Sequence, residues 1–402
     1  MTPSPTALAS LLEPALPDSD GLGTLAAEVV SAIARLDGRI AGGLAHVIPP
    51  LFRAAHTHHS LYIEDRPSTL KELASAVSSA SRTKTRDREA DLRASLDVLA
   101  WLHEGDGRAL AERTPADVAF VRSLHERFYA AFPAAARRLR VADSGREVDV
   151  APGALRSERA TVGTHDAPDS DTIAVLLDIW SRRFAPDSTM SLADRLLLAV
   201  SSHHRLLYIH PFRDGNGRVA RFALDAYLIA LGLDAKGAWT PARGFARART
   251  AYYAALGAAD DERRSATDGR GSRSADGLAR WCRFVLEVFR DQAEFVTALL
   301  EPAALSERLR AAVTASLRST PAAAEKAVRL VRCAWSIGPI TRGDIARDAG
   351  VPDRTARRLL IELATIGWIA EAASPDSREA PVVGAVPLLH APTVFPNLFL
   401  PE

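Results

Sequence analysis

The sequence predicts a mainly α-helical protein with a β-hairpin near its middle and a small mixed α/β segment at its C-terminal end. Apolar residues recur at helical spacing over most of the chain, and polar segments with Gly and Pro separate these stretches. Alternating β-branched residues occur only around 147–164 and in two short runs near the end. A chain of 402 residues is too long to fold around a single hydrophobic core of ordinary size, so several structural units are expected.

The clearest helix pattern begins at Leu22, continues through Val29 and Ile33, and stops before Gly38. A second helix is expected from Pro50 to about Glu64. Further helices are expected over 70–80, 90–102, 116–132, 171–184, 191–208, 216–231, 243–258 and 278–300. The polar, glycine-rich stretch 261–277 predicts an exposed loop, and the proline-containing residues 1–20 predict a flexible arm.

Two segments depart from the helical pattern. Residues 147–164 predict a hairpin with a flexible tip around Gly163. After residue 321 the pattern predicts a helix (322–337), a short strand (340–341), two helices (342–349 and 353–366) and two strands (368–370 and 381–383) around a polar tip. This order is typical of a winged helix-turn-helix.

The composition is that of an ordinary globular protein, with 47% apolar and 25% charged residues. The 50 basic residues nearly cancel the 49 acidic ones, so no overall charge favours nucleic acid or an anionic membrane. Cys282 and Cys333 lie in apolar helical stretches and are expected to be buried thiols. The sequence shows no signal-peptide pattern and no membrane-spanning apolar run, so we expect a cytoplasmic protein without a membrane partner.

One loop between two expected helices carries the residues suited to phosphate chemistry, reading HPFRDGNGRVAR from 210 to 221. Gly215 and Gly217 allow a sharp turn that points backbone N–H groups at an anion where the next helix begins. Arg218 and Arg221 are three residues apart, so they share a helix face and could bind successive phosphates. The loop therefore predicts a polyphosphate site.

Three further side chains of this loop complete the chemistry. Asp214 suits a Mg²⁺ ion that bridges nucleotide phosphates, and Asn216 could add a neutral hydrogen-bond donor. His210 is the group whose pKa suits proton removal from a hydroxyl near neutral pH. Each residue alone also has an ordinary structural explanation, so the prediction depends on their combination.

Together these residues resemble the signature of the Fic family, HPF-x-(D/E)-GNGR-xx-R, at all nine specified positions. The residues before the motif, 203–209, and those after it, 247–256 with the pair Tyr252 and Tyr253, also resemble the flanking helices of Fic proteins. The resemblance covers roughly residues 50–300 in outline.

The resemblance implies a protein adenylyltransferase that uses ATP and Mg²⁺. His210 would deprotonate a Ser, Thr or Tyr hydroxyl of a target protein, which then attacks the α-phosphate of ATP and releases pyrophosphate. The other roles it implies are Mg²⁺ binding by Asp214, phosphate binding by Gly215, Asn216, Gly217, Arg218 (β-phosphate) and Arg221 (γ-phosphate), and nucleotide binding by Tyr252 and Tyr253.

The expected hairpin resembles the family's flap, which holds a target peptide as an added strand. Thr161, Val162 and Gly163 are the docking positions that this resemblance implies. A plain structural hairpin remains the alternative, since hairpin tips vary freely.

An upstream segment, Ser60 to Asp65, resembles the family's inhibitory motif (S/T)-xxx-E-(G/N), with Asp65 as the one departure. Ser60 and Glu64 are four apart on a helix, so the serine is expected to brace the carboxylate. Glu64 would pair with Arg221 and displace the γ-phosphate. The alternative is an ordinary solvated glutamate.

These features divide the chain into an arm (1–20), a helical region with the inhibitory helix at about 50–66 (21–110), a catalytic core (111–302) and a winged helix-turn-helix domain (303–402). The last domain could bind DNA through Arg354, Arg357 and Arg358. Because acidic residues such as Asp353 and Glu362 dilute this charge, protein docking or dimerisation stays equally open.

Several alternatives concern the reaction itself. Related enzymes transfer other phosphate-containing groups or phosphorylate their targets, and the same site could remove AMP from a modified protein. A transcriptional regulator that senses nucleotide is a further alternative. The target, self-modification and the formation of a homodimer are not determined by the sequence.

Overall fold

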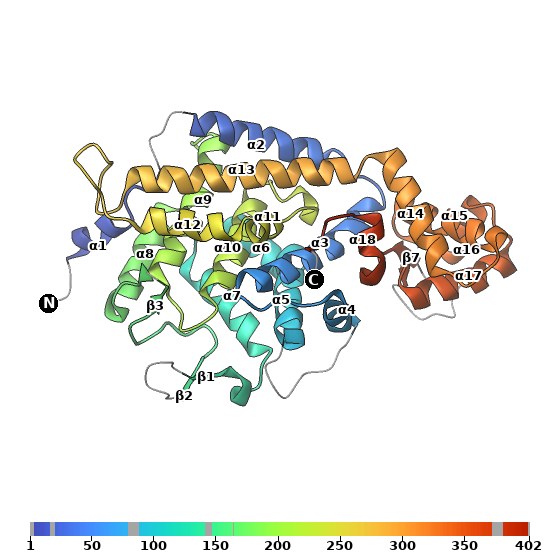
Figure 1. Cartoon of the computed structure of the whole chain (residues 1–402), viewed down its shortest axis with the longest axis horizontal. Coiled ribbons are helices and arrows are strands. Elements are labelled where there is room, and N and C mark those ends of the chain that lie inside the picture. The colour runs from blue at the N-terminus through green and yellow to red at the C-terminus, as the bar shows by residue number, and fades with distance from the viewer. Residues whose placement is uncertain are drawn as a thin grey trace.

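The computed structural model describes residues 4–16, 21–78, 88–140, 147–163, 165–371 and 381–400, and it is mainly helical, as predicted (Figure 1). The long helix α13 (Ala275–Leu299) packs along α2 (Leu22–Asp37) and covers one side of the molecule. Behind them lie α9 (Leu192–Ile209) and α10 (Asn216–Ala230), which are buried on nearly every face. The loop predicted to bind phosphate joins these two central helices.

The remaining helices surround this pair. They are α1 (Pro5–Leu11), α3 (Leu44–Ile63), α4 (Leu70–Ser78), α5 (Arg88–Glu104), α6 (Asp106–Arg113), α7 (Val118–Ala130), α8 (Ile173–Arg183), α11 (Pro241–Arg247), α12 (Arg249–Asp260) and α14 (Pro302–Ser316). Helix α3 packs against α5 and α11, which places its C-terminal end beside the start of α10. None of the helices in these described ranges is long and apolar enough to cross a membrane.

The C-terminal segment contains the elements in the predicted order (Figure 1). These are α15 (Pro321–Ile337), β5 (Ile340–Thr341), α16 (Arg342–Asp348), α17 (Asp353–Ile366), β6 (Ile369–Glu371) and β7 (Pro381–Gly384). The three strands form an antiparallel sheet in the order β5-β7-β6. The polar tip between β6 and β7 lies outside the described residues, and the winged-helix designation stays a prediction.

The last residues return to the centre of the molecule, which the sequence did not predict. Helix α18 (Ala391–Val394) packs on α14, and the chain continues to α3. There the carbonyl oxygen of Leu398 accepts a hydrogen bond from Nε2 of His59 at 2.8 Å. The ring of Phe399 packs against His58 and His59. The C-terminal residues thus contact the helix that carries Glu64.

The N-terminal arm differs from the expectation. Residues 5–11 form α1, because Ser4 caps its first turn and Pro5 suits the first helical position. Leu8 and Leu12 are buried in the core. Residues 8–16 are therefore packed rather than loose, whereas 4–7 are exposed and 1–3 and 17–20 lie outside the described residues.

The hairpin expected over 147–164 is also different. Strand β2 (Glu147–Asp149) pairs with β1 (Arg138–Arg140), which the sequence pattern had not indicated. A second, separate ladder joins β3 (Thr161–Val162) to β4 (His165–Asp166), with Gly163 at a positive φ of 59°. The intervening residues turn at Gly153 and bury Arg156, so they cannot form one continuous ladder. Thr164 lies outside the described residues.

Other differences are smaller. Helix α3 begins six residues before Pro50, at Leu44, and the helix expected over 243–258 is divided into α11 and α12 at Ala248. Helices α6 and α14 were not predicted. Cys282 is buried and Cys333 partly buried, and both are free thiols.

Candidate active site

The loop between α9 and α10 is shaped by two left-handed residues. His210 has a φ of 50° and ends α9, and Gly215 has a φ of 79° and precedes α10. A Cβ atom on Gly215 would approach the Tyr129 ring to 3.0 Å, so glycine also provides the space for this contact. The first N–H groups of a helix have no partner within that helix, and Gly217 in the first turn of α10 lines a cavity.

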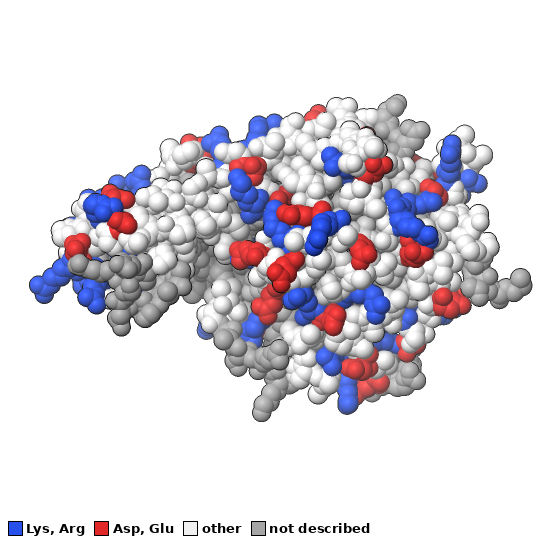
Figure 2. Space-filling model, turned by 180° about the vertical axis from the view of Figure 1, so that it is seen from behind, with Lys and Arg blue, Asp and Glu red and all other residues white. Residues whose placement is uncertain are grey.

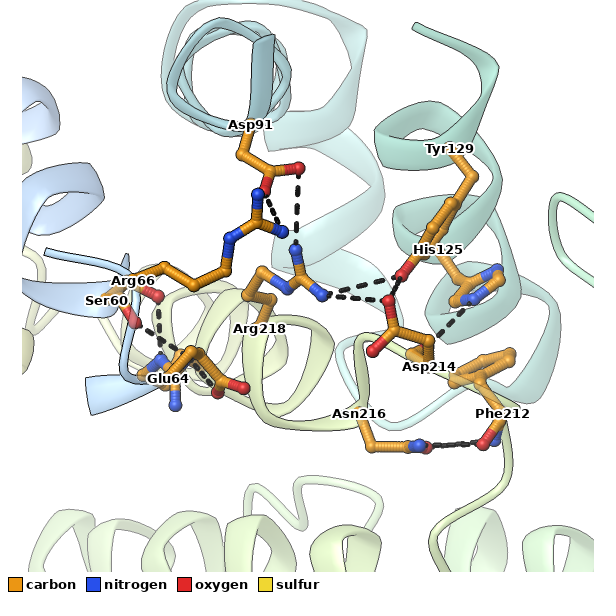
Figure 3. A network of polar contacts seen from close by, with 11 residues as sticks. Ser60, Glu64, Arg66, Asp91, His125, Tyr129, Phe212, Asp214, Asn216 and Arg218 are labelled. Atoms are coloured by element: carbon orange, nitrogen blue, oxygen red, sulfur yellow. Dashed lines mark hydrogen bonds and ion pairs between the residues drawn. The ribbon is translucent and has the colours of Figure 1, made fainter. Parts of the chain in front are cut away.

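Asn216 has a different role from the predicted one. Its Oδ1 accepts a hydrogen bond from the backbone N–H of Phe212 at 2.9 Å, and its Nδ2 donates to the carbonyl oxygen of Phe212 at 2.7 Å (Figure 3). The side chain is buried. Asn216 therefore closes the loop through both polar atoms of its side chain.

A cavity of about 450 Å³ lies in front of this loop. Its lining brings together most of the residues predicted for the site and adds several more: Glu64, Val162, Gly163, His165, His204, Leu207, Tyr208, His210, Gly217, Arg221, Tyr252, Tyr253, Leu256, Gly257 and Asp260. Of the predicted site residues, Ser60, Thr161, Asp214, Gly215, Asn216 and Arg218 are not part of this lining. The α10 end of the cavity is thus charged, whereas α12 contributes two tyrosines, a leucine, a glycine and Asp260.

His210 is the predicted base, and its surroundings keep it neutral. Burial lowers its pKa to about 4, and the nearby positive charges of His165 and Arg156 act in the same direction. A neutral imidazole can accept a proton at physiological pH. The structure therefore places a neutral imidazole at the cavity wall.

Arg156 fixes the backbone around His210 and was missed by the sequence reasoning. Its Nε donates to the carbonyl oxygen of His210 at 2.7 Å, and its Nη atoms donate to the carbonyl oxygens of Glu158 and Pro168. It is 4% exposed, although it lies in an irregular segment with no helical or strand pattern. No pattern in the neighbouring sequence indicates that Arg156 binds the backbone around His210.

Arg218 belongs to a network of alternating charges (Figure 3). Its Nη2 lies 3.2 Å from Oδ2 of Asp214 and its Nη1 lies 3.8 Å from Oδ1 of Asp91. Asp91, which is fully buried on α5, also pairs with Arg66 at 2.5 Å. The hydroxyl of Tyr129 donates to Asp214. Asp91 was missed by the sequence reasoning, because its burial and its pairing depend on the tertiary fold.

Asp214 is the predicted Mg²⁺ ligand, and its donor chemistry fits that ion. Mg²⁺ in nucleotide sites is commonly held by one or two carboxylates, with phosphates and water completing an octahedron. No cluster of three or more His, Cys, Asp or Glu side chains that could hold a metal exists among the described residues. A single carboxylate beside an anion-binding turn suits an ion that arrives with its nucleotide.

Glu64 and Arg221 form the contact predicted for the inhibitory motif. Oε1 of Glu64 lies 2.7 Å from Nη2 of Arg221, whose side chain is 2% exposed. Burial opposes ionisation of Glu64, but the charges of Arg221 and Arg218 hold its pKa below the ordinary value. A Cβ atom on Gly217 would lie 2.2 Å from Oε1 of Glu64. The carboxylate therefore lies directly over Gly217 in the first turn of α10.

Ser60 contacts the arginine rather than the glutamate, contrary to the expectation. Its Oγ accepts a hydrogen bond from Nε of Arg221 at 2.8 Å, and its carbonyl oxygen accepts from Nη2 at 3.3 Å. Ser60 thus orients Arg221 toward Glu64 and braces the carboxylate only indirectly.

The end of α3 is held by α12. Asp65 has a φ of 55°, a left-handed conformation that Asp and Asn tolerate better than most residues. It pairs with Arg249, whose Nε also donates to the carbonyl oxygen of Ile63 at 3.0 Å. The hydroxyl of Tyr253 donates to the same carbonyl at 2.9 Å. Asp65 therefore suits this position, despite its departure from the motif.

The predicted docking positions lie on the β3–β4 hairpin. Thr161, Val162 and Gly163 are exposed, and Val162, at 49% exposure, also lines the cavity. Oγ1 of Thr161 donates to Oδ1 of Asp166 at 2.7 Å. This short hairpin borders the same cavity as His210.

Charged residues of both signs alternate over the face seen in Figure 2. Basic and acidic side chains lie close together over much of the surface, as the near-zero net charge requires. This face therefore offers no broad basic area for a polyanion.

Comparisons with known proteins identify the central part of the chain. Residues 115–228 match the model of the Fic/DOC family, so the chain contains a Fic domain. The proteins named protein adenylyltransferase Fic from Drosophila persimilis and Drosophila melanogaster are 32% and 31% identical over 80 residues. That segment is 20% of this chain and 16% of either relative, so the match spans a small part of both.

Two solved structures resemble the chain over a longer range. A Fic family protein from Desulfovibrio desulfuricans G20 has a TM-score of 0.49 and 18% identity, covering 92% of this chain and 98% of that one. Fic-1 from C. elegans has a TM-score of 0.47 and 16% identity, covering 68% and 71%.

Proposed function

We propose that this protein transfers AMP from ATP to a Ser, Thr or Tyr hydroxyl of a target protein. The observation that carries this proposal is the position of neutral His210 in the same cavity as Gly217 and Arg221 at the start of α10. The Fic domain and the name of the Drosophila relatives support a transferase that uses ATP. The α12 side of the cavity, with Tyr252 and Tyr253, would receive the nucleoside.

In the proposed reaction, separate parts of the site bind the phosphates, remove the proton and hold the metal ion. The N–H groups at the start of α10 and the guanidinium of Arg221 would bind the phosphates, with Arg218 beside the β-phosphate. His210 would remove the proton from the target hydroxyl, whose oxygen forms a bond to the α-phosphorus while the bond to the β-phosphate oxygen breaks. Pyrophosphate leaves. Mg²⁺, held by Asp214 when bound with the nucleotide, supplies charge neutralisation.

We further propose that Glu64 inhibits this reaction. Its carboxylate occupies the place on Arg221 and over Gly217 where a γ-phosphate would bind. Two anions cannot share this position, so ATP would bind in an unreactive pose or weakly. The hydrogen bonds from Arg249 and Tyr253 to the carbonyl oxygen of Ile63 would keep the adjacent glutamate there.

Labelled ATP tests the reaction. The Glu64→Gly variant should incorporate label from the α-phosphate of ATP into itself or another protein, and none from the γ-phosphate. The matched variant Glu64→Gly with His210→Ala should incorporate neither. Incorporation from the γ-position would indicate phosphorylation, and incorporation from neither by either variant would refute the transferase proposal.

Removal of AMP from a modified protein is the alternative at the same site, because Glu64 could also orient a water molecule in the cavity. Wild type would then release AMP from the automodified Glu64→Gly protein, whereas His210→Ala would not. Spontaneous loss at the same rate with both proteins would exclude this activity.

DNA binding by the C-terminal segment is a second candidate function, favoured by one observation. Arg354, Arg357 and Arg358 are exposed along α17, while its other face packs Leu359 and Leu363 in the core. Such a helix could enter a major groove. A gel shift with genomic fragments should be lost when the three arginines are replaced by alanine, and an unchanged shift would exclude this surface.

A further inference from the structure

A second histidine faces the cavity that contains His210. His165 lies on strand β4, directly opposite Val162 of β3. Its Nε2 lies 2.9 Å from the carbonyl oxygen of Tyr208, and its Nδ1 lies 3.1 Å from Oδ2 of Asp260. Because a carbonyl and a carboxylate only accept hydrogen bonds, both ring nitrogens must carry a proton for both contacts to form. The geometry thus describes an imidazolium cation.

Asp260, at the end of α12, is arranged to be the counter-ion. Its other oxygen, Oδ1, lies 3.2 Å from Nε2 of His204 on α9. That nitrogen also contacts the carbonyl oxygen of Leu256 at 3.1 Å, whereas Nδ1 of His204 faces Nη1 of Arg205 at 3.3 Å. His204 is therefore neutral with its proton on Nε2. The carboxylate accepts an N–H from each histidine.

The pKa directions agree with this assignment. Burial opposes the charge on His165, yet the hydrogen bond and charge of Asp260 raise its pKa above the ordinary value. Burial likewise opposes the charge on Asp260, and the two histidines hold its pKa below the ordinary value. Burial lowers the pKa of His204. The other charged or titratable groups around the pair are Arg205 and Tyr208 of α9, His210 after that helix, and Arg273 and Glu262 after α12.

The hairpin needs such a support. Its ladder has only two residue pairs, Thr161 with Asp166 and Val162 with His165, and a ladder this short is marginal in water on its own. Arg156 anchors the base of the hairpin through the carbonyl oxygens of Glu158 and Pro168. His165 provides the attachment next to the tip, and it joins the hairpin to α9 and α12.

The geometry points to His165 as a positioning residue, whose ion pair with Asp260 holds the β3–β4 hairpin where a docked target strand presents its hydroxyl to His210. This inference rests on the proposed AMP transfer. Without the pair, the hairpin moves relative to His210 while the phosphate site at α10 is unchanged. The target step of the reaction then suffers more than the binding of ATP.

Hydrogen exchange tests the attachment without any activity. Amides of 158–163 and 165–166 should exchange at least about tenfold faster in His165→Phe than in wild type. The change removes both hydrogen bonds of the imidazolium, to Asp260 and to Tyr208, and the loss of one charge-assisted bond alone accounts for about tenfold. In wild type, after correction for intrinsic exchange, protection should fall as the pH rises through the raised pKa of His165. The control His390→Phe, which keeps its stacking on Trp368 far from the cavity, should leave this segment unchanged.

The effect on transfer is measured in the Glu64→Gly background. His165→Phe should lower the maximal automodification rate about tenfold and change the Kd for MgATP by less than about threefold, and His165→Gln, which keeps one donor, should recover part of the rate. The Glu64→Gly rate should decline at alkaline pH, and this decline should be absent in His165→Phe.

Two results would overturn the inference. One is unchanged hydrogen exchange of this segment in His165→Phe, and the other is a fall in transfer rate that is fully accounted for by weaker binding of MgATP. If Glu64→Gly transfers no AMP at all, the proposed function fails. The exchange comparison still decides whether His165 holds the hairpin, so the two failures remain distinguishable.

Discussion

Replacing Glu64 by glycine should convert a nearly silent protein into an active one. The change removes the carboxylate that lies 2.7 Å from Nη2 of Arg221 and above Gly217. A γ-phosphate then gains a charge-assisted hydrogen bond that Glu64 holds in the wild type. Such a bond contributes about 1.5–3 kcal/mol, which corresponds to a rate increase of about 10- to 150-fold at 25 °C.

The assay is the initial rate of incorporation of α-labelled AMP, normalised to protein. Glu104→Gly is the matched control, because Glu104 ends α5 and pairs with Arg53 at 2.6 Å outside the cavity. It should leave the rate unchanged, and Glu64→Gln should give an intermediate rate. Equal rates for wild type and Glu64→Gly, with MgATP bound by both, would refute inhibition by this glutamate.

Three further predictions concern the surroundings of this pair. Asp91→Ala leaves the buried Arg218 without one of its counter-ions and should cost about 3–5 kcal/mol of unfolding free energy in urea, whereas a loss below about 1 kcal/mol would show that the network is not stabilising. Arg249→Ala should raise the wild-type transfer rate about 2- to 5-fold, since the exposed pair with Asp65 contributes about 0.5–1 kcal/mol, and no increase would exclude a restraining role. Because the pKa of His210 is lowered to about 4 and the base works unprotonated, the rate of Glu64→Gly should persist as the pH falls below about 6.5. An acid limb centred at the ordinary histidine value would contradict this.

The helical fold was predictable because apolar periodicity and Gly or Pro boundaries agree along most of the chain. Leu22–Asp37 and Ala275–Leu299 were located within a few residues for this reason. The two short ladders were not, since β1 and β3 contain three and two residues and depend on partners rather than on their own pattern. Helix α1 was missed because its leucines are buried only by contacts distant in sequence.

The site likewise has features that a sequence motif predicted and features that depend on the tertiary fold. The contiguous motif at 210–221 predicted the turn, and the resemblance of Ser60 to Asp65 to an inhibitory motif predicted the pairing of Glu64 with Arg221. Side chains that act from distant segments gave no such signal. Arg156 and Asp91 reach the loop only through the tertiary fold, and Asn216 turned inward because the tight turn leaves backbone groups of Phe212 to be satisfied.

A calorimetric titration with MgATP tests the central claim most directly. The Glu64→Gly protein should bind one nucleotide per chain, and the added replacement Arg221→Leu should weaken that binding at least about tenfold, the cost of a charged phosphate contact. Absence of binding heat in Glu64→Gly, or an affinity indifferent to Arg221, would contradict the assignment of this turn as a nucleotide site.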